Sequence, residues 1–249
     1  MSNKKILSKR IIPDLKLKIW RKNFLFEIGT MNPIKPEKKI IYIEKGNSKV
    51  GYKNHEYYKT WVWNLPPIIA CPQASEWCRE SCYNADNREE VFPINKWMEN
   101  YYLAVNYLET VKNQIIETLK KDEHRKIAFR IHSSGDFISN KYIRMWLNIV
   151  KECRHVDFWT YTRSWEDDKL IGDLILLREE ENIQVFASWD KTMKALPSGW
   201  RKSVVYEPEE ILELDNGIIC PEQSGSIESC IDCKFCLKNR SKNVFFILH

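Results

Sequence analysis

The sequence of 249 residues has no long hydrophobic run, no internal repeat and no low-complexity linker. Its longest apolar stretches, such as LIGDLILL at residues 170–177, are far too short to cross a bilayer. No apolar signal segment follows the lysine-rich start. We therefore expect a cytoplasmic protein with no membrane partner, in a compartment that keeps its thiols reduced.

Seven of the eight cysteines fall into two groups. The front group is Cys71, Cys78 and Cys82, and the tail group is Cys220, Cys230, Cys233 and Cys236. Closely spaced thiols in an intracellular protein bind metal more often than they form disulfides. The eighth, Cys153, lies in the helical run KYIRMWLNIVKEC and is interpreted as a small buried hydrophobic residue. The other seven are the predicted metal ligands.

The two groups predict iron–sulfur clusters, because a [4Fe–4S] cube has four irons that each take one external ligand, usually a cysteine thiolate. In the tail, Cys230-x-x-Cys233-x-x-Cys236 has the tight spacing that surrounds one cluster, with Cys220 as the fourth ligand. The front group supplies three thiolates and would leave one iron open for chemistry. Two alternatives stay open: one cluster instead of two, and zinc in the tail, since four-cysteine zinc sites tolerate variable loops.

Length and composition indicate one globular unit, because 249 residues with 43% hydrophobic content can bury a full core. Strand-like runs alternate with helical ones, which is the pattern of a parallel sheet with crossover helices. The predicted fold class is α/β, a full or partial TIM-like (βα) barrel with a C-terminal cysteine-rich extension that binds a cluster. Its expected parts are a basic N-terminal extension with a strand (1–58), the barrel-like core (59–215) and the cysteine-rich segment packed on that core (216–249).

Hydrophobic patterning predicts the individual elements. Strands are expected at KKIIYIEK (38–45), YKTWVWNLP (58–66), RKIAFRIH (125–132), VDFWTYT (156–162), IQVFASWD (183–190) and KSVVYEP (202–208). Helices are expected as a pair within 89–121 and singly at 140–153 and 165–181.

Polar residues follow the predicted strands, and in a βα barrel the carboxyl ends of the strands form the rim that carries the chemistry. They are His132, Ser133, Ser134, Gly135 and Asp136, then Thr162, Arg163 and Ser164, then Ser188, Trp189 and Asp190, and finally Glu207. Each has an ordinary structural explanation, such as a helix cap, a tight turn or a core hydrogen bond. Their coincidence on one rim with the front cysteines indicates a site. A metal-dependent hydrolase using His132, Asp136 and Asp190 is the least favoured reading, because thiolates suit softer metals.

Several motifs together resemble the phage gene product 88 family and related three-cysteine phage proteins. They are CPQASEWCRESCYNA, RIHSSGDF, WLNIV, YTRS and CPEQ…SCIDCKFC with a closing VFFILH, over about Trp61 to His249. These families are in turn similar to the radical S-adenosylmethionine enzymes, in which a three-cysteine cluster follows the first barrel strand. A polar turn after the second strand holds the amino group of S-adenosylmethionine. Cys71, Cys78 and Cys82 match the first feature, and Ser134, Gly135 and Asp136 match the second.

The resemblance implies a radical S-adenosylmethionine-like enzyme whose open front iron binds the cofactor. Arg163 and Ser188 are candidates for contact with the carboxylate or ribose of S-adenosylmethionine. A ferredoxin or flavodoxin is the expected electron donor, and the tail cluster is expected to be an electron relay or a structural staple. The substrate and the catalytic residues stay unassigned.

A second hypothesis is a phage or mobile-element nucleic-acid-binding protein with structural or redox-sensing clusters. Residues 1–22 carry eight lysines and arginines against one aspartate, and the chain has ten tryptophans, some of which would be available for base stacking.

Overall fold

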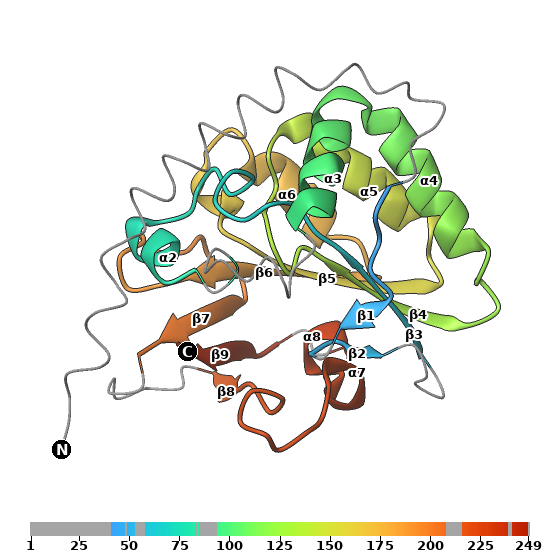
Figure 1. Cartoon of the computed structure of the whole chain (residues 1–249). Coiled ribbons are helices and arrows are strands. Elements are labelled where there is room, and N and C mark those ends of the chain that lie inside the picture. The colour runs from blue at the N-terminus through green and yellow to red at the C-terminus, as the bar shows by residue number, and fades with distance from the viewer. Residues whose placement is uncertain are drawn as a thin grey trace. The chain divides into compact units, whose positions relative to one another are not determined.

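The computed structural model has a parallel sheet at its centre, with helices on one face and the cysteine-rich tail on the other (Figure 1). The structure describes residues 41–47, 49–52, 58–82, 84, 94–207, 216–238 and 241–248. All of these belong to one unit, Ile40–His249. The basic segment 1–22 lies outside the described residues, so its predicted role is carried by the sequence alone.

The strands are β1 (Gly46–Asn47), β2 (Gly51–Tyr52), β3 (Tyr58–Trp63), β4 (Lys126–Ile131), β5 (Val156–Thr162), β6 (Ile183–Trp189), β7 (Lys202–Tyr206), β8 (Gly217–Ile219) and β9 (Asn243–Ile247). The helices are α2 (Glu76–Glu80), α3 (Ile94–Asn106), α4 (Leu108–Lys120), α5 (Asn140–Glu152), the 3₁₀ turn η3 (Ser164–Glu166), α6 (Ile171–Arg178), α7 (Cys230–Cys233) and α8 (Phe235–Lys238). Among the described helices, none combines the length and apolar character of a membrane span.

The main sheet of the described residues runs β3-β4-β5-β6-β7-β9-β8, and every neighbouring pair is parallel. The predicted parallel α/β class is therefore confirmed. A full barrel is not formed in the described part, because β3 and β8 are opposite edges of an open sheet. The outer edge of β3 is instead occupied at Val62 by two backbone hydrogen bonds of 2.9 Å with Glu44.

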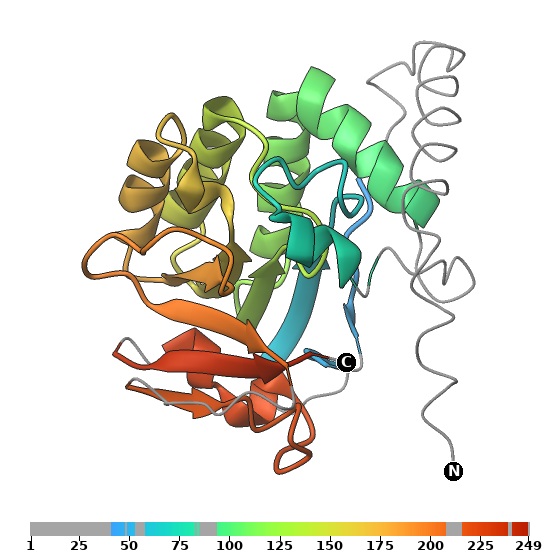
Figure 2. The ribbon, with the colours of Figure 1, turned by 90° about the vertical axis from the view of Figure 1, so that its left-hand side faces the viewer.

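Strand alternation separates the two faces of the sheet, because successive side chains point to opposite sides. On β5, Phe158 packs with the helices, whereas Trp159 and Tyr161 face the tail. The turned view in Figure 2 shows α3 to α6 on one side of the strands and the tail helices on the other. The sheet face that a closed barrel would enclose is thus covered by the tail.

Aromatic side chains dominate the core between the sheet and the helices. Trp146 of α5 meets Phe129 of β4 with ring centroids 5.6 Å apart and Trp63 of β3 with centroids 6.3 Å apart. Truncating such a buried ring costs about 3–5 kcal/mol, so this contact holds α5 firmly on the first two strands of the sheet.

Three elements differ from their predictions. Residues 41–45 form no strand, since Glu44 makes only an isolated bridge. The helix expected over 165–181 is split into η3 and α6 because the Asp167 side chain accepts the backbone N–H of Lys169 at 2.8 Å, which favours a turn. The C-terminal segment, whose last residues had no assigned element, supplies β8 and β9 to the main sheet.

Candidate metal centres at the two cysteine groups

The front loop, defined here as residues 70–82, carries all three front cysteines and the short helix α2. Ser75 caps this helix: its Oγ accepts the backbone N–H of Cys78 at 3.1 Å. The same hydroxyl donates to Asp190 Oδ2 at 2.7 Å, just beyond the end of β6. Ser75 therefore joins the cysteine loop to the carboxyl edge of the sheet, a link that the sequence analysis did not identify.

The turn after β4 holds the other end of the front loop. The backbone N–H of Asp136 donates to the carbonyl of Ala70 at 2.7 Å, and the N–H of Leu65 donates to Ser134 O at 3.1 Å. Gly135 has φ +84°, and a Cβ there would lie 2.6 Å from Leu65 Cβ. Only glycine allows the two segments to approach this closely, so the motif SSGD brings β3 and β4 together at the front loop.

Asp136 is buried and its carboxylate is already engaged by the protein. It accepts hydrogen bonds from the Phe137 N–H (2.7 Å), Thr162 Oγ1 (2.6 Å) and the Arg163 N–H (2.8 Å). Burial raises the pKa of Asp136 above its usual value, although these hydrogen bonds partly counter that effect. Asp136 therefore ties the ends of β4 and β5 together, and the described contacts support a positioning role for it.

Ser134 differs from Asp136 in this respect. Its side chain is 4% exposed, and its Oγ has no hydrogen-bond partner among the described residues. A buried hydroxyl without a partner costs free energy unless a ligand satisfies it. Of the three residues that matched the cofactor turn, Ser134 is the one whose side chain has hydrogen-bonding capacity to spare.

The three front thiols lie near one another and near charged groups. Burial raises the pKa of Cys71 well above its usual value, and the charges of Asp136, Cys82 and Cys78 raise it further. Burial also raises the pKa of Cys78, while the positive charge of Arg163 opposes this rise. Without a metal these two sulfurs are therefore protonated thiols, and metal binding would release their protons.

Arg163 and Asp190 form a buried ion pair beside Cys78, with side chains 8% and 1% exposed. Arg163 is also close enough to Cys78 to oppose the rise in the pKa of that thiol. Burial raises the pKa of Asp190, but hydrogen bonds from Thr192 and Ser75 and the charge of Arg163 outweigh this and lower it overall. The charge of Arg163 therefore favours the thiolate form of Cys78, while the carboxylates of Asp190 and Asp136 oppose it.

Glu207 and Ser188, two further residues at strand ends, lie in different parts of the structure. Glu207 accepts a hydrogen bond of 3.4 Å from Trp77 Nε1 in α2, so it lies at the front loop. Strand alternation places the Ser188 side chain on the face of Phe186, which packs toward the tail. Ser188 is therefore less well placed beside Cys78 than Arg163 is.

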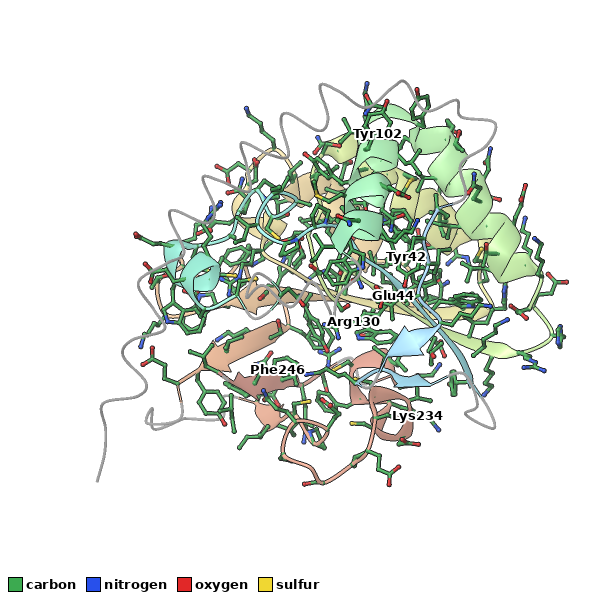
Figure 3. The ribbon with its side chains drawn as sticks, in the orientation of Figure 1. Tyr42, Glu44, Tyr102, Arg130, Lys234 and Phe246 are labelled. Atoms are coloured by element: carbon green, nitrogen blue, oxygen red, sulfur yellow. The ribbon has the colours of Figure 1, made fainter. Side chains whose placement is uncertain are left out.

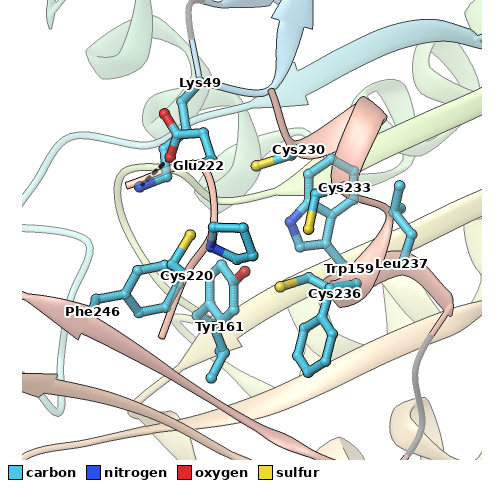
Figure 4. A pocket seen from close by; sticks show the side chains of 13 residues that line it. Lys49, Trp159, Tyr161, Cys220, Glu222, Cys230, Cys233, Cys236, Leu237 and Phe246 are labelled. Carbon is cyan, nitrogen blue, oxygen red and sulfur yellow. Dashed lines mark ion pairs between the residues drawn. The ribbon is translucent and has the colours of Figure 1, made fainter. Parts of the chain in front are cut away.

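The four tail cysteines line one pocket, called the tail pocket below (Figure 4). Its empty space is about 390 Å³, including space open to solvent, and Trp159 and Tyr161 of β5 form part of its wall. Cys220 is held by its backbone N–H, which donates to Phe245 O at 2.8 Å, and Cys230 by its N–H, which donates to Lys49 O at 2.9 Å. Two segments far apart in the chain therefore position the tail thiols.

Local geometry turns the remaining tail cysteines toward the same pocket. Ser229 caps α7, and Lys234 in the left-handed conformation (φ 56°) reverses the chain between α7 and α8. This turn lies between Cys233 and Cys236 and lets both line the pocket. Burial raises the pKa of Cys230 to about 11 and that of Cys236 to about 12, so both are neutral thiols at neutral pH in the absence of metal.

All eight cysteines lie within the described residues, and none is in a disulfide. Cys153 is fully buried at the end of α5, away from both groups, as its interpretation as a core residue requires. Within the described ranges, no three His, Cys, Asp or Glu side chains are gathered closely enough to hold a single metal ion.

Sequence reasoning did not identify several neighbours of the thiols, namely Ser75, Lys49, Arg130, Trp159, Tyr161 and Arg201. Strand alternation in VDFWTYT would have placed Trp159 and Tyr161 on one face, and a serine before α2 is a usual cap signal. Lys49 and Arg201 gave no comparable signal, because their position depends on how the tail folds back on the sheet.

Comparisons with known proteins agree on one family. A family model described as gene product 88 matches residues 38–239. The Gene 88 protein of Mycobacterium phage L5 is 25% identical over 232 residues, covering 83% of this chain and 92% of that protein. The Gene 88 protein of Mycobacterium phage D29 is 30% identical over 135 residues, covering 49% of this chain and 53% of that protein. No solved structure matches the chain, and none of these names states an activity.

Proposed function

The chain belongs to the gene product 88 family, and from its two cysteine groups we propose that it is an iron–sulfur protein of the radical S-adenosylmethionine-like type. The tail pocket would hold a [4Fe–4S] cluster with four cysteine ligands. The front loop would hold a second cluster with three cysteine ligands and one open iron. A ferredoxin or flavodoxin in the cytoplasm is the proposed electron donor.

The observation that carries this proposal is the convergence of Cys220, Cys230, Cys233 and Cys236 on one pocket. The donor set is made only of sulfur, and aromatic and aliphatic side chains form much of the wall, which suits a soft metal cluster shielded from water. A cluster distributes its thiolates over four irons, so it takes a wider arrangement of sulfurs than one zinc ion, whose cysteine ligands lie about 2.3 Å from a single centre. Zinc stays the alternative occupant of this pocket.

At the front, the number of cysteines and their polar neighbours support an exchangeable fourth ligand. When bound, a cluster with an open iron supplies a site for the amino and carboxylate groups of S-adenosylmethionine and the electron that cleaves its sulfur–carbon bond. The buried Arg163 cation, next to Cys78, is suited to an incoming carboxylate. The Ser134 hydroxyl is free to hydrogen-bond a ligand, while Gly135 and Asp136 hold the turn in place.

The first test is metal analysis of protein that is purified and reconstituted without oxygen. About eight irons and eight sulfides per chain, with an electron paramagnetic resonance spectrum changed by S-adenosylmethionine, would support both sites. About four irons and no spectral change would leave one cluster and remove the enzyme proposal. Zinc without iron would overturn both cluster assignments.

A substitution then separates cofactor cleavage from folding. Cys78→Ala should abolish reductive cleavage of S-adenosylmethionine while the tail cluster keeps its iron, because the two groups occupy different parts of the structure. Cys153→Ala is the matched control, since it removes a buried thiol that belongs to neither group. Normal cleavage by Cys78→Ala would contradict the front-site assignment.

The nucleic-acid-binding alternative rests on residues 1–22, which are outside the described residues, and on tryptophans available for stacking, most of which are buried in the described part of the chain. A gel shift that weakens with salt, without consumption of S-adenosylmethionine, would favour this alternative.

A further inference from the structure

The wall of the tail pocket includes the Tyr161 hydroxyl, and two arginines lie against aromatic rings on the sheet side of the pocket. We propose that Tyr161, together with Arg201 and Arg130, stabilises the reduced state of the tail cluster, so that this site accepts electrons and is more than a structural staple. This inference rests on the proposed function, because it requires a cluster in the tail pocket.

Tyr161 is held so that its hydroxyl meets a cysteine. Its ring packs against Phe186 with centroids 5.2 Å apart and meets Phe246 edge-on with centroids 5.6 Å apart. Its hydroxyl lies close enough to Cys236 to oppose the rise in the pKa of that thiol, and both residues line the pocket (Figure 4). Because two aromatic neighbours fix the ring, the position of the hydroxyl oxygen is set before any cluster binds.

Two arginines place positive charge behind this tyrosine. The Arg130 guanidinium lies 5.3 Å from the centroid of the Tyr161 ring, and its side chain, on the tail side of the sheet in Figure 3, is almost fully buried. Arg201 lies 4.0 Å from the centroid of the Phe186 ring and is held by a 2.9 Å hydrogen bond to Gln184 Oε1. The charge of Arg130 acts on Cys230, and that of Arg201 acts on Cys236.

A third cation, Lys49, is compensated by an acidic partner. Its Nζ lies 3.3 Å from Glu222 Oε2, and both residues line the pocket. Lys49 also acts on Cys230, but its carboxylate partner offsets part of its field. Lys49 therefore adds less positive field at the thiols than its own charge would supply.

These groups favour one redox state over the other. A cube with four thiolate ligands is negatively charged, and reduction adds one further electron to its iron. No bond breaks and no proton moves in that step, and the electron comes from a low-potential one-electron donor protein. Hydrogen bonds to the sulfurs and nearby cations stabilise the more negative state, and the effect is large where water is excluded. The oxidised cluster is negative too and gains from the same groups, but the reduced cluster carries one more negative charge and gains more.

The test uses the full chain with the front ligands removed by Cys71→Ala, Cys78→Ala and Cys82→Ala, so that only the tail cluster is observed. In this background, Tyr161→Phe deletes the donor and keeps the ring. We expect unchanged iron and sulfide content and a reduction equilibrium about tenfold less favourable, which is a midpoint potential lower by about 59 mV for one electron. Arg201→Gln should lower the potential in the same direction. Tyr206→Phe is the matched control, because Tyr206 is a buried tyrosine of β7 that packs with Val204 and Phe245.

The outcomes separate this inference from the proposed function. If the background protein binds no iron and sulfide in the tail, the proposed function fails there. If it binds a cluster whose potential is the same with Tyr161→Phe, Arg201→Gln and Tyr206→Phe, only the tuning fails. Loss of the cluster from both the Tyr161 and Arg201 variants would assign these side chains to holding the cluster, and would also overturn the tuning role.

Discussion

The front loop and the tail pocket use the same kind of ligand in different surroundings. Beside the front thiols lie the ionised Arg163–Asp190 pair and the buried Asp136, brought from the ends of three strands. Beside the tail thiols lie aromatic rings, with arginines behind them. A polar neighbourhood suits a ligand that binds and leaves, whereas an enclosed sulfur pocket suits a permanent group. Under the proposed function, the number of cysteines and their neighbours would together distinguish the two sites.

The largest expected effect comes from removing one cysteine ligand from each site, which tests whether the two sites bind separate clusters. Cys78→Ala and Cys230→Ala should each lower iron by about four per chain in reconstituted protein, because each cluster carries four irons. Cys153→Ala should keep the full complement. Iron and sulfide analysis decides the matter, and an equal loss from both sites in either variant would show that the clusters do not form independently.

The buried ion pair should be important for the stability of the front site. Arg163→Met leaves Asp190 as an uncompensated charge in a dry environment, and we expect the free energy of unfolding to fall by about 3–5 kcal/mol. Urea denaturation measures this. Lys120→Met, which removes an exposed ion pair of 3.6 Å with Glu152, should cost less than about 1 kcal/mol. Equal losses in the two variants would show that the pair at the front is no more than a surface contact.

Two glycines, one beside the front loop and one in the tail loop, test how tightly the backbone is packed in each region. Gly225→Ala in the tail loop has only the positive φ of +72° to overcome, which costs about 1–2 kcal/mol. Gly135→Ala also brings a Cβ to 2.6 Å from Leu65 Cβ, and this overpacking should cost about 1–3 kcal/mol more. Thermal or urea unfolding of both variants measures the difference. Indistinguishable values would mean that Leu65 moves aside easily.

The last expected effect concerns pH and involves a single residue. Burial lowers the pKa of His132 from 6.5 to about 3, with the charge of Arg130 contributing, so the unfolded chain binds more protons than the folded one between these values. The free energy of unfolding should therefore fall as the pH falls through this window, by at most about 1.4 kcal/mol per pH unit from this residue.

His132→Gln should flatten that slope between pH 6 and pH 4 in urea denaturation, whereas the exposed His124→Gln should leave it unchanged. This pH dependence of the unfolding free energy cannot come from a histidine of the tail, because residues 216–248 contain none. A slope unaffected by His132→Gln would show that this histidine does not control acid stability.

Elements with a clear hydrophobic pattern were predicted closely. The strand expected over 156–162 is β5 with the same bounds, and the two helices expected within 89–121 are α3 and α4. The strand predicted over 38–45 does not form in residues 41–45, the part that the structure describes. Apolar composition alone does not supply a pairing partner. A full barrel does not form in the described residues, because closure depends on which edges meet and β3 and β8 stay at opposite edges of the sheet.

For the site, the chain order and spacing of the residues were enough to group the thiols and to place polar side chains at the strand ends. Those features are local, since a strand alternates its side chains and a tight CxxCxxC run keeps its thiols together wherever it lies. The neighbours of the thiols are not local. Tyr161 meets Cys236, and Ser75 meets Asp190, only because parallel strands align their ends and the tail folds back across the open face of the sheet. Contacts between segments so far apart in the chain depend on the packing of the whole unit, which no local pattern encodes.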